Sequence, residues 1–296
     1  LEPCSHHGRT PPCVDALIEA KPARVIVAMQ DPNPEVCGQG LEQLRMQGIE
    51  VIVGVLAEQA RELNRGFVKR MQQQLPFVSI KMACSLDGRS ALSNGSSQWI
   101  TSAPARRDVQ FLRARASAIL SSAQTVLNDD PSLNLRLSKN ELKQIFEVRQ
   151  PVRALVDSRL RLSGSEKLFS LPGEIWIYTT SNDEDRHERL GARGATVIQV
   201  DSDVSGQVDL AAMMRDMAQR GINEVHTECG QRLAGALLQQ RLADQLVLYL
   251  APHLLGSDAR GGFDIGELTA MDQRTTCSMR DIRQFGDDLR LTLNVD

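Results

Sequence analysis

The sequence lacks several features that would assign a protein to a broad class before any motif is considered. No apolar run approaches the roughly 20 residues that cross a bilayer, and no charged-then-apolar signal segment is present. The net charge is only -3, with 34 basic and 37 acidic residues interspersed, so we expect neither nucleic acid nor a membrane as a partner. There is no internal repeat or low-complexity tract. The 296 residues therefore predict a globular protein of about two domains.

The six cysteines do not have the spacing of a disulfide framework. Cys84 and Cys229 lie in or beside apolar, strand-like runs, which is typical of reduced thiols in a cytosolic protein. We therefore expect a cytoplasmic location.

Apolar runs alternate with helical segments along the whole chain, which predicts an α/β protein with a parallel sheet covered by helices. Proline 76 marks the expected boundary between domains 1–75 and 76–296. We also predict one long amphipathic helix over 57–74, a half-buried strand over 133–137, a helix over 139–150, and a C-terminal hairpin of 281–285 with 289–295.

The stretch from 77 to 136 carries charged residues that its elements do not need for folding. Lys81 lies inside an apolar strand, where its ammonium must reach a cavity or a partner. A polar loop follows and ends at Trp99, and then a helix begins near Thr101 and Ser102, whose hydroxyls we expect to cap it. Two adjacent carboxylates, Asp129 and Asp130, precede a proline. A strand–helix–strand unit with ordinary surface charges is the plain alternative, but Lys81 and the two aspartates favour a functional site.

Two cysteines near the start are candidate metal ligands. Cys4 and Cys13 are separated by a loop rich in glycine and proline, and Cys13 opens a predicted helix whose dipole favours a thiolate. A catalytic zinc needs three protein ligands, and only these two are evident, although His6 or His7 could be a third. Two free thiols remain an equal alternative on pattern alone.

A strand over 222–228, a turn at Gly230 and a helix from Arg232 form a unit suited to binding an anion. Free amide hydrogens and the helix dipole point at a ligand in such units. The glycine spacing of the dinucleotide fingerprint is missing. Anion or nucleotide binding and a plain tight turn both remain open.

Short motifs spread along the chain resemble those of a known family. They are Glu2-Pro3-Cys4 with Gly8-Arg9-Thr10-Pro11-Pro12-Cys13, Asp31-Pro32-Asn33-Pro34, Ser85-Leu86-Asp87-Gly88-Arg89, Ser97-Gln98-Trp99-Ile100-Thr101, Asp129-Asp130-Pro131 and Leu254-Leu255-Gly256. Over essentially its full length the chain resembles the bifunctional riboflavin-biosynthesis enzymes, in which a pyrimidine deaminase is fused to a 5-amino-6-(5-phosphoribosylamino)uracil reductase.

The resemblance implies two domains of different chemistry. Residues 1–75 would be the C-terminal part of a cytidine-deaminase-like α/β/α domain, with Cys4 and Cys13 as zinc ligands. Residues 76–296 would be a dihydrofolate-reductase-like α/β domain that uses NADPH. The family's zinc-binding histidine and catalytic glutamate precede the cysteine motif, so we expect an N-terminally truncated chain that does not deaminate by itself. We also expect a homodimer.

The resemblance also assigns roles to individual residues of the reductase. Lys81 and Asp129 would flank the reacting centre, with Asp129 handling a proton or orienting the ribose. The phosphoribosylaminopyrimidine substrate would be held by Ser97, Arg113, Ser132, Arg136 and Glu228. The cofactor would be held by Ala83, Trp99, Thr125, Asp129, Ser158 and the turn of Gly230, Gln231, Arg232, Leu233, Ala234, Gly235 and Ala236.

Three points of the resemblance stay open. The family commonly has smaller residues or proline where this chain has Cys229-Gly230-Gln231, which affects the geometry of the cofactor turn. Arg159 could meet the cofactor's 2'-phosphate or be a solvated surface residue. A reductase of the same fold acting on another pyrimidine or pterin, and a nucleotide-binding module without turnover, are the alternative functions.

Overall fold

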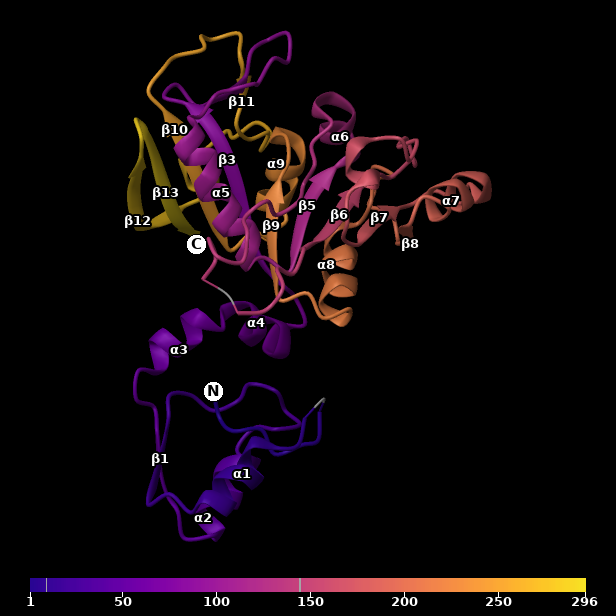
Figure 1. The fold of residues 1–296 in the computed structure, drawn as a ribbon. Helices are drawn as coiled ribbons and strands as arrows, with labels where there is room; N and C mark the ends of the chain where they lie inside the picture. The colour runs from indigo at the N-terminus through magenta and orange to yellow at the C-terminus, as the bar shows by residue number, and fades with distance from the viewer. Residues whose placement is uncertain (9, 144) are drawn as a thin grey trace. The chain divides into compact units, whose positions relative to one another are not determined.

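The computed structural model describes residues 1–8, 10–143 and 145–296, and it divides into two compact units, Leu1–Pro76 and Phe77–Asp296 (Figure 1). Arg9, one residue of the first motif, lies outside the described residues, as does Gln144 of the helix predicted over 139–150. Among the described residues, no helix has the length and apolar character to cross a membrane.

The first unit is a small α/β arrangement around two parallel strands. Val14, Leu44 and Ile49 are its buried core. Its elements are α1 (Cys13–Ala20), β1 (Arg24–Val27), α2 (Gln39–Met46), β2 (Glu50–Val53), α3 (Ala57–Leu63) and α4 (Arg65–Gln73). The predicted alternation of strand and helix is present.

The carboxylate of Glu2 organises the loops of this unit. Glu2 is only 4% exposed and accepts four backbone N–H groups: those of Asp31 (3.1 Å) and Gly38 (2.9 Å) on Oε2, and of Gly40 (2.9 Å) and Leu41 (3.3 Å) on Oε1. The last two belong to the first turn of α2, whose amide hydrogens have no partner within the helix. The first residue of the Glu-Pro-Cys motif is therefore explained by hydrogen bonding.

The single helix predicted over 57–74 is wrong, because the chain forms α3 and α4 with a break at Asn64. The backbone of Asn64 leaves helical geometry at φ -107° and ψ 17°. Its side-chain nitrogen donates to the carbonyl of Ala60 at 2.8 Å. A polar side chain that bonds the backbone locally competes with a continuous helix, and the apolar periodicity on both sides concealed this break.

The second unit is built on a nine-stranded sheet in the order β12-β13-β10-β3-β9-β5-β6-β7-β8. The strands from β10 to β8 run parallel, and β13 and β12 add an antiparallel hairpin at one edge. The strands are β3 (Phe77–Ser85), β5 (Ala118–Ser122), β6 (Val152–Val156), β7 (Ile175–Thr179), β8 (Ala195–Gln199), β9 (Glu224–Glu228), β10 (Gln245–Ala251), β12 (Cys277–Phe285) and β13 (Asp288–Val295). The predicted α/β class and C-terminal hairpin are confirmed.

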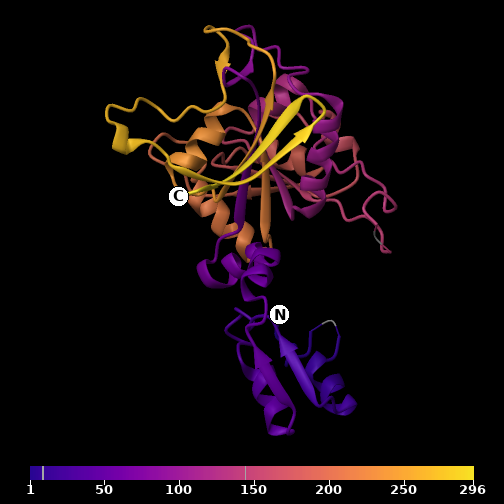
Figure 2. The ribbon, with the colours of Figure 1, turned by 90° about the vertical axis from the view of Figure 1, so that its left-hand side faces the viewer.

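Helices cover both faces of this sheet. The edge view in Figure 2 shows the magenta α5 on one face and the orange α8 and α9 on the other. This follows from right-handed crossovers, because α5 leads from β3 towards β8 whereas α9 leads back to β10. The helices are α5 (Ala103–Arg115), α6 (Ala123–Asp129), α7 (Glu184–Gly191), α8 (Leu210–Gln219) and α9 (Gln231–Gln239), with short helices η1 (Lys167–Ser170) and η2 (Met271–Gln273) and a small pair of strands, β4 (Arg89–Ala91) and β11 (Arg260–Gly261).

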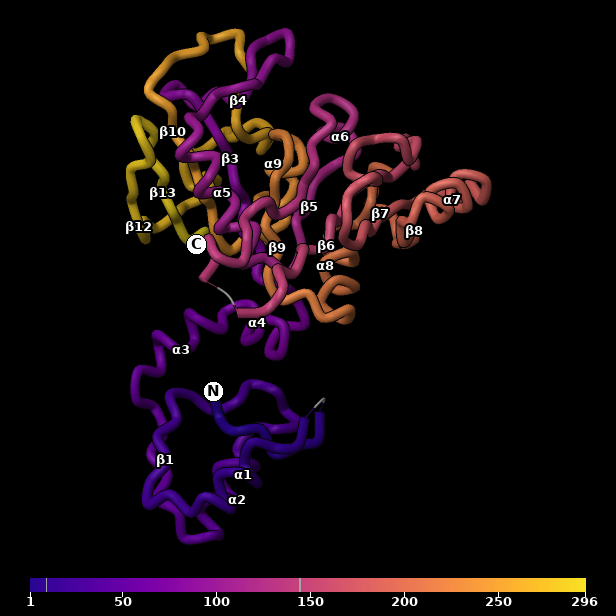
Figure 3. The backbone as a smooth tube through the Cα atoms, viewed as in Figure 1, coloured from indigo at the N-terminus to yellow at the C-terminus, as the bar shows by residue number. Residues whose placement is uncertain are grey.

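The strand predicted over 133–137 is wrong, although its alternating burial is right. Leu133, Leu135 and Leu137 are buried, but the segment pairs with no strand and forms the loop that follows α6 in Figure 3. Its backbone bonds to side chains instead, since Leu135 and Arg136 donate to Gln150 and Gln110 at 2.9 Å. The side-chain amides of Gln110 and Gln150 thus accept the backbone hydrogen bonds that a neighbouring strand would accept.

Two local predictions beside α5 are also wrong. Residues 139–143 and 145–150 form turns and extended chain and no helix. Glu141 explains this in part, because its carboxylate accepts the backbone N–H of Ser138 at 2.9 Å and closes a turn. The hydroxyl of Ser102 does not cap α5. It donates to Asp288 at 2.7 Å and so joins the start of α5 to the hairpin.

The buried side chain of Arg153 on β6 holds the segment of residues 168–173 in place. Its side chain is 1% exposed, and its guanidinium donates to the carbonyls of Leu168, Leu171, Pro172 and Gly173. These hydrogen bonds hold residues 168–173 against the start of β6.

Replacing Arg153 by Met should lower the free energy of unfolding by roughly 2–4 kcal/mol, because buried carbonyls lose their donor. Urea unfolding followed by circular dichroism measures this. Arg215→Met on the exposed side of α8 is the matched control and should change stability by less than about 0.5 kcal/mol. Equal stability of the two variants would contradict the assignment.

Candidate functional site

The predicted site residues of the second unit gather at the carboxyl ends of neighbouring parallel strands. Lys81 on β3 stands directly beside Glu228, the last residue of β9. Ser122 ends β5, and Ser158 follows β6 by two residues. Ligands of open α/β sheets bind at this edge, so the fold brings distant parts of the sequence to one place.

Glu228 and Arg113 form an ion pair at the centre of this edge. Arg113 Nε lies 2.5 Å from Glu228 Oε1, and Nη2 lies 2.9 Å from Oε2. The side chains are only 8% and 16% exposed. Ser121 also donates its hydroxyl to the backbone carbonyl of Glu228 at 2.7 Å. Glu228 is therefore held at both its side chain and its main chain.

The charged groups of this site shift one another's pKa values. Burial alone would raise the pKa of Glu228, but the charge of Arg113 and hydrogen bonds from His226 and Arg113 hold that pKa well below its usual range. Burial lowers the pKa of Lys81, which Glu228 opposes and Arg113 reinforces. The ammonium of Lys81 also lies 5.9 Å from the ring centroid of Tyr249. Lys81 therefore gives up its proton more readily than a surface lysine.

The loop after α6 brings two further predicted residues to the ion pair. Arg113 Nη1 donates to the carbonyl of Asn134 at 2.7 Å, which ties this loop to α5. Arg136 Nη1 lies 3.4 Å from the Ser132 hydroxyl. Burial and the charge of Arg113 lower the pKa of Arg136. Arg136 is exposed whereas Arg113 is buried, so Arg136 is the more accessible cation.

Helix α6 carries Thr125 and Asp129. Ser122 accepts the backbone N–H of Thr125 at 3.2 Å and caps the helix, which fixes Thr125 beside the end of β5. Asp129 is the last residue of α6, and desolvation by the surrounding protein raises its pKa. A carboxyl group with a raised pKa keeps its proton to a higher pH than usual, as a general acid requires.

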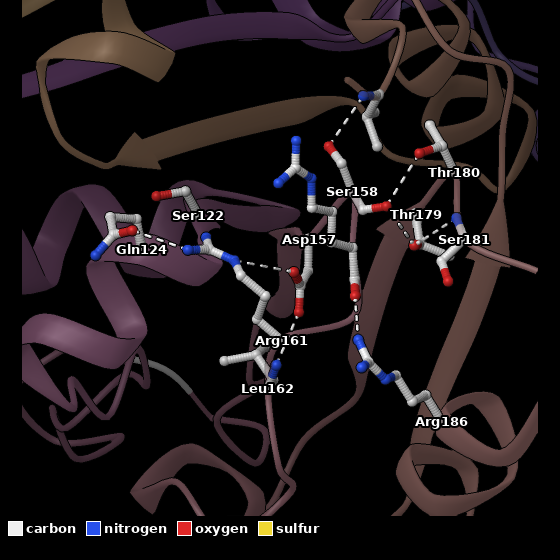
Figure 4. A network of polar contacts seen from close by, with 12 residues as sticks. Ser122, Gln124, Asp157, Ser158, Arg161, Leu162, Thr179, Thr180, Ser181 and Arg186 are labelled. Atoms are coloured by element: carbon white, nitrogen blue, oxygen red, sulfur yellow. Dashed lines mark hydrogen bonds and ion pairs between the residues drawn. The ribbon is translucent and has the colours of Figure 1, made fainter. Parts of the chain in front are cut away.

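Ser158 lies in a polar network between β6 and β7 (Figure 4). Its hydroxyl accepts the N–H of Val208 at 3.0 Å, and its carbonyl accepts the hydroxyls of Thr179 and Thr180 at 3.2 and 3.0 Å. Asp157 beside it is buried and accepts the N–H of Leu162 at 3.0 Å. The network holds the backbone of 157–158 in one position.

Gly230 caps the N-terminus of α9, as predicted, and the helix includes Gln231 to Ala236. Gly235 is required by packing, since a Cβ there would lie 1.8 Å from the carbonyl oxygen of Asp264. The backbone N–H of Asp264 donates to Gln231 at 3.1 Å. These contacts fix the first turn of α9 against the loop after β11.

The polar loop before α5 has less support from side-chain contacts. Trp99 is 69% exposed, with the guanidinium of Arg106 4.4 Å from its ring centroid. Ser97 is half-buried, and so is Ala83 on β3. Ala83 packs against Tyr249 and Val247 under α5.

The sequence interpretation missed His226, Ser121 and Tyr249. His226 is buried two residues before Glu228 on the same strand face. Tyr249 donates its hydroxyl to Asp108 at 2.5 Å, and Arg290 binds the same carboxylate at 2.7 Å. For His226 the available signal was its place between Glu224 and Glu228 at every second position of one strand; Ser121 and Tyr249 had no such signal.

Cys4 and Cys13 meet part of the requirement for zinc. The backbone N–H of Cys13 lies 3.2 Å from the Cys4 sulfur, and hydrogen bonding to Cys4 raises the pKa of Cys13. Thiolates suit zinc. Among the described residues, however, no three histidine, cysteine or acidic side chains are grouped as a metal site. The two cysteines can supply two ligands, and the described residues supply no third.

Two motifs far apart in the sequence meet at the carboxyl end of β3. The carboxylate of Asp87 accepts the hydroxyl of Ser85 and the backbone N–H groups of Leu255 and Gly256, the latter at 2.9 Å. These bonds, led by that of Ser85, lower the pKa of Asp87 to about 2. The Ser85–Arg89 and Leu254–Gly256 motifs therefore form one structural contact beside the site.

Comparison with known proteins agrees with this arrangement. Residues 76–291 match the family model of the RibD C-terminal domain. The riboflavin biosynthesis protein RibD of Escherichia coli is 45% identical over 99% of this chain and 80% of that protein. That of Haemophilus influenzae is 43% identical over 99% and 78%.

Solved structures show the same fold. Acinetobacter baumannii RibD superimposes with a TM-score of 0.90 at 37% identity, covering all of this chain and 79% of that one. A riboflavin biosynthesis reductase from Saccharomyces has a TM-score of 0.60 at 17% identity over 81% of this chain and 99% of that one, and it supports the fold alone. The fold is thus that of the riboflavin-biosynthesis reductases. More specifically, the chain belongs to the RibD family, which confirms the predicted role in riboflavin biosynthesis.

Replacing Asp87 by Asn should destabilise the second unit in a pH-dependent way. The folded pKa of about 2 is lower than the ordinary value of about 3.9, so the stabilisation is present above about pH 4 and is lost as the pH falls towards 2. Urea unfolding should therefore separate wild type from variant more at pH 6 than at pH 3. Asp272→Asn, an exposed position, is the control. A separation that does not change with pH would contradict this assignment.

Proposed function

We propose that residues 77–296 reduce the ribosyl group of 5-amino-6-(5-phosphoribosylamino)uracil to ribityl, with NADPH as hydride donor. The observation that carries this proposal is the juxtaposition of Lys81, Glu228 and Arg113, with Arg136 close enough to feel their charges, in a RibD-family sheet. When bound, NADPH supplies the hydride to the imine-like carbon of the opened ribosyl group.

Asp129 is the proposed proton donor. The reduction needs a proton near the anion that develops at the reacting centre, and the raised pKa of Asp129 lets this carboxyl group remain protonated at higher pH. Lys81, whose pKa is lowered by burial, flanks the same centre and stabilises negative charge there without a hydration shell.

The substrate is held at its two ends. Glu228, kept ionised by Arg113, accepts N–H groups of the pyrimidine. Arg136 with Ser132 binds the 5-phosphate, since Arg136 is exposed and its Nη1 lies 3.4 Å from the neutral Ser132 hydroxyl, which leaves its charge for a phosphate. Ser97 contributes a further hydroxyl. The buried Arg113 supports this phosphate site through the carbonyl of Asn134.

The cofactor is held by groups that follow three strands. Thr125 follows β5, Ser158 follows β6, and Gly230 with the first residues of α9, up to Ala236, follows β9. The free amides at the start of α9 suit a phosphate. Ala83 and the exposed ring of Trp99 contact the remaining part of the cofactor.

The first unit is proposed to be part of a zinc-dependent pyrimidine deaminase. Cys4 and Cys13, adjacent at the start of α1, would supply two zinc ligands. Zinc bound there would activate water for attack on an amine-bearing ring carbon. A cytoplasmic homodimer is proposed together with this activity.

The direct test is NADPH oxidation on addition of 5-amino-6-(5-phosphoribosylamino)uracil. Rapid oxidation with NADPH and markedly slower oxidation with NADH are expected. A folded sample that binds NADPH without turnover would favour a nucleotide-binding module. Turnover only with another pyrimidine or pterin would favour the same-fold alternative.

Asp129→Asn should lower kcat by about 10²–10⁴-fold and change the Kd of NADPH by less than about threefold, because the variant loses the proton and keeps the shape. Stopped-flow kinetics and fluorescence titration measure the two effects. With wild type, kcat should fall as the pH rises through the raised pKa of Asp129. Unchanged kcat in the variant would exclude Asp129 as the proton donor.

A further inference from the structure

His226 is the buried side chain beside the Glu228–Arg113 pair that the proposed reaction leaves without a role. It is 4% exposed. Its Nε2 lies 3.4 Å from Glu228 Oε1, but this contact is not aligned as a hydrogen bond, and Nε2 has no hydrogen-bond partner among the described residues. Buried polar atoms without a partner are unfavourable and uncommon, so this placement calls for an explanation.

The face of β9 that packs under α5 is a row of three polar residues, Glu224, His226 and Glu228. Each glutamate has an arginine of α5 in contact: Arg115 Nε lies 2.9 Å from Glu224 Oε2, and Arg113 holds Glu228. His226 stands between these two ion pairs. Its neighbours on the adjacent strands, Ser79 and Ile119, are uncharged.

We infer that His226 carries a hydrogen on Nε2 and directs it at Glu228 Oε1, which makes His226 a positioning residue for the carboxylate that contacts the pyrimidine. This inference rests on the proposed function for its kinetic consequence, but its structural part does not. Glu228 is ionised, and a carboxylate can only accept. Nε2 must therefore be the donor.

The contact determines the orientation of Glu228. Arg113 alone could follow the carboxylate through small rotations, since the two nitrogens that bind Glu228, Nε and Nη2, approach it from one side. His226 approaches Oε1 from the strand itself, and the rigid β9 backbone, fixed by Ser121, sets the direction. At 3.4 Å the contact is longer than an ordinary N–H···O bond, and its role is to restrict the rotamer of Glu228.

The tautomer can be tested without any activity. Long-range ¹H–¹⁵N spectra of ¹⁵N-histidine-labelled protein resolve five histidines, and the signals of His226 are those that disappear in His226→Gln. A protonated Nε2 with the shift of a pyrrole-type nitrogen is expected at pH 8. An unprotonated Nε2 would overturn the inference, whatever the enzyme assay shows.

Kinetics test the positioning role. His226→Gln places a side-chain N–H near the original Nε2 and should keep the substrate KM within about twofold, whereas His226→Leu should raise that KM about five- to tenfold. The KM for NADPH should stay unchanged in both. Thr227→Val, buried on the opposite face of β9, is the matched control.

The outcomes separate the two proposals. A His226→Leu enzyme with the wild-type substrate KM would overturn the positioning role. Equal increases of substrate KM in His226→Gln and His226→Leu would overturn it as well. If His226→Leu does not fold, the measured tautomer of His226 and the substrate KM of His226→Gln still test the inference. Failure of the proposed function would appear as absent turnover in wild type, which leaves the spectroscopic result intact.

Discussion

The bidentate ion pair of Arg113 and Glu228 is the interaction on which the second unit's site depends. It joins α5 to β9, and through Asn134 it also fixes the loop that carries Ser132 and Arg136. Removing either partner would leave a buried charge without compensation, which is among the most destabilising single changes. Arg113 keeps Glu228 ionised, and the two charges act in opposite directions on the pKa of Lys81, which burial lowers. Stability and the electrostatics of the site therefore have one source.

Sheet order explains why residues so distant in sequence share one site. Helix α5 leads from β3 past β9 to β5, and the chain later returns to insert β9 between them. The carboxyl edge at that point collects residues from four separate crossovers, and each is fixed by its own short network. Such an edge can be assembled only when all these crossovers are complete.

The sequence predicted those elements that depend on the periodicity of apolar residues and on the positions of glycine. The strand with Lys81 and the turn at Gly230 before α9 were both predictable. It could not predict features that side chains decide after folding. Gln110 and Gln150 replace a strand partner for Leu135 and Arg136, Asn64 divides a helix, and Ser102 binds Asp288 in place of its own helix. The family motifs indicated candidate site residues, but the pairing of Arg113 with Glu228 across 115 positions has no local signal.

The placement of β3 has a consequence for synthesis of the chain. β3 is the first strand of its unit, yet both its neighbours, β9 and β10, come from residues 224–228 and 245–251. During translation its backbone edges stay unpaired until about two-thirds of the following residues have emerged. Such long-range pairing slows folding, and an unpaired apolar strand invites association with other chains. Cotranslational chaperones are therefore expected to engage the nascent protein at residues 77–85.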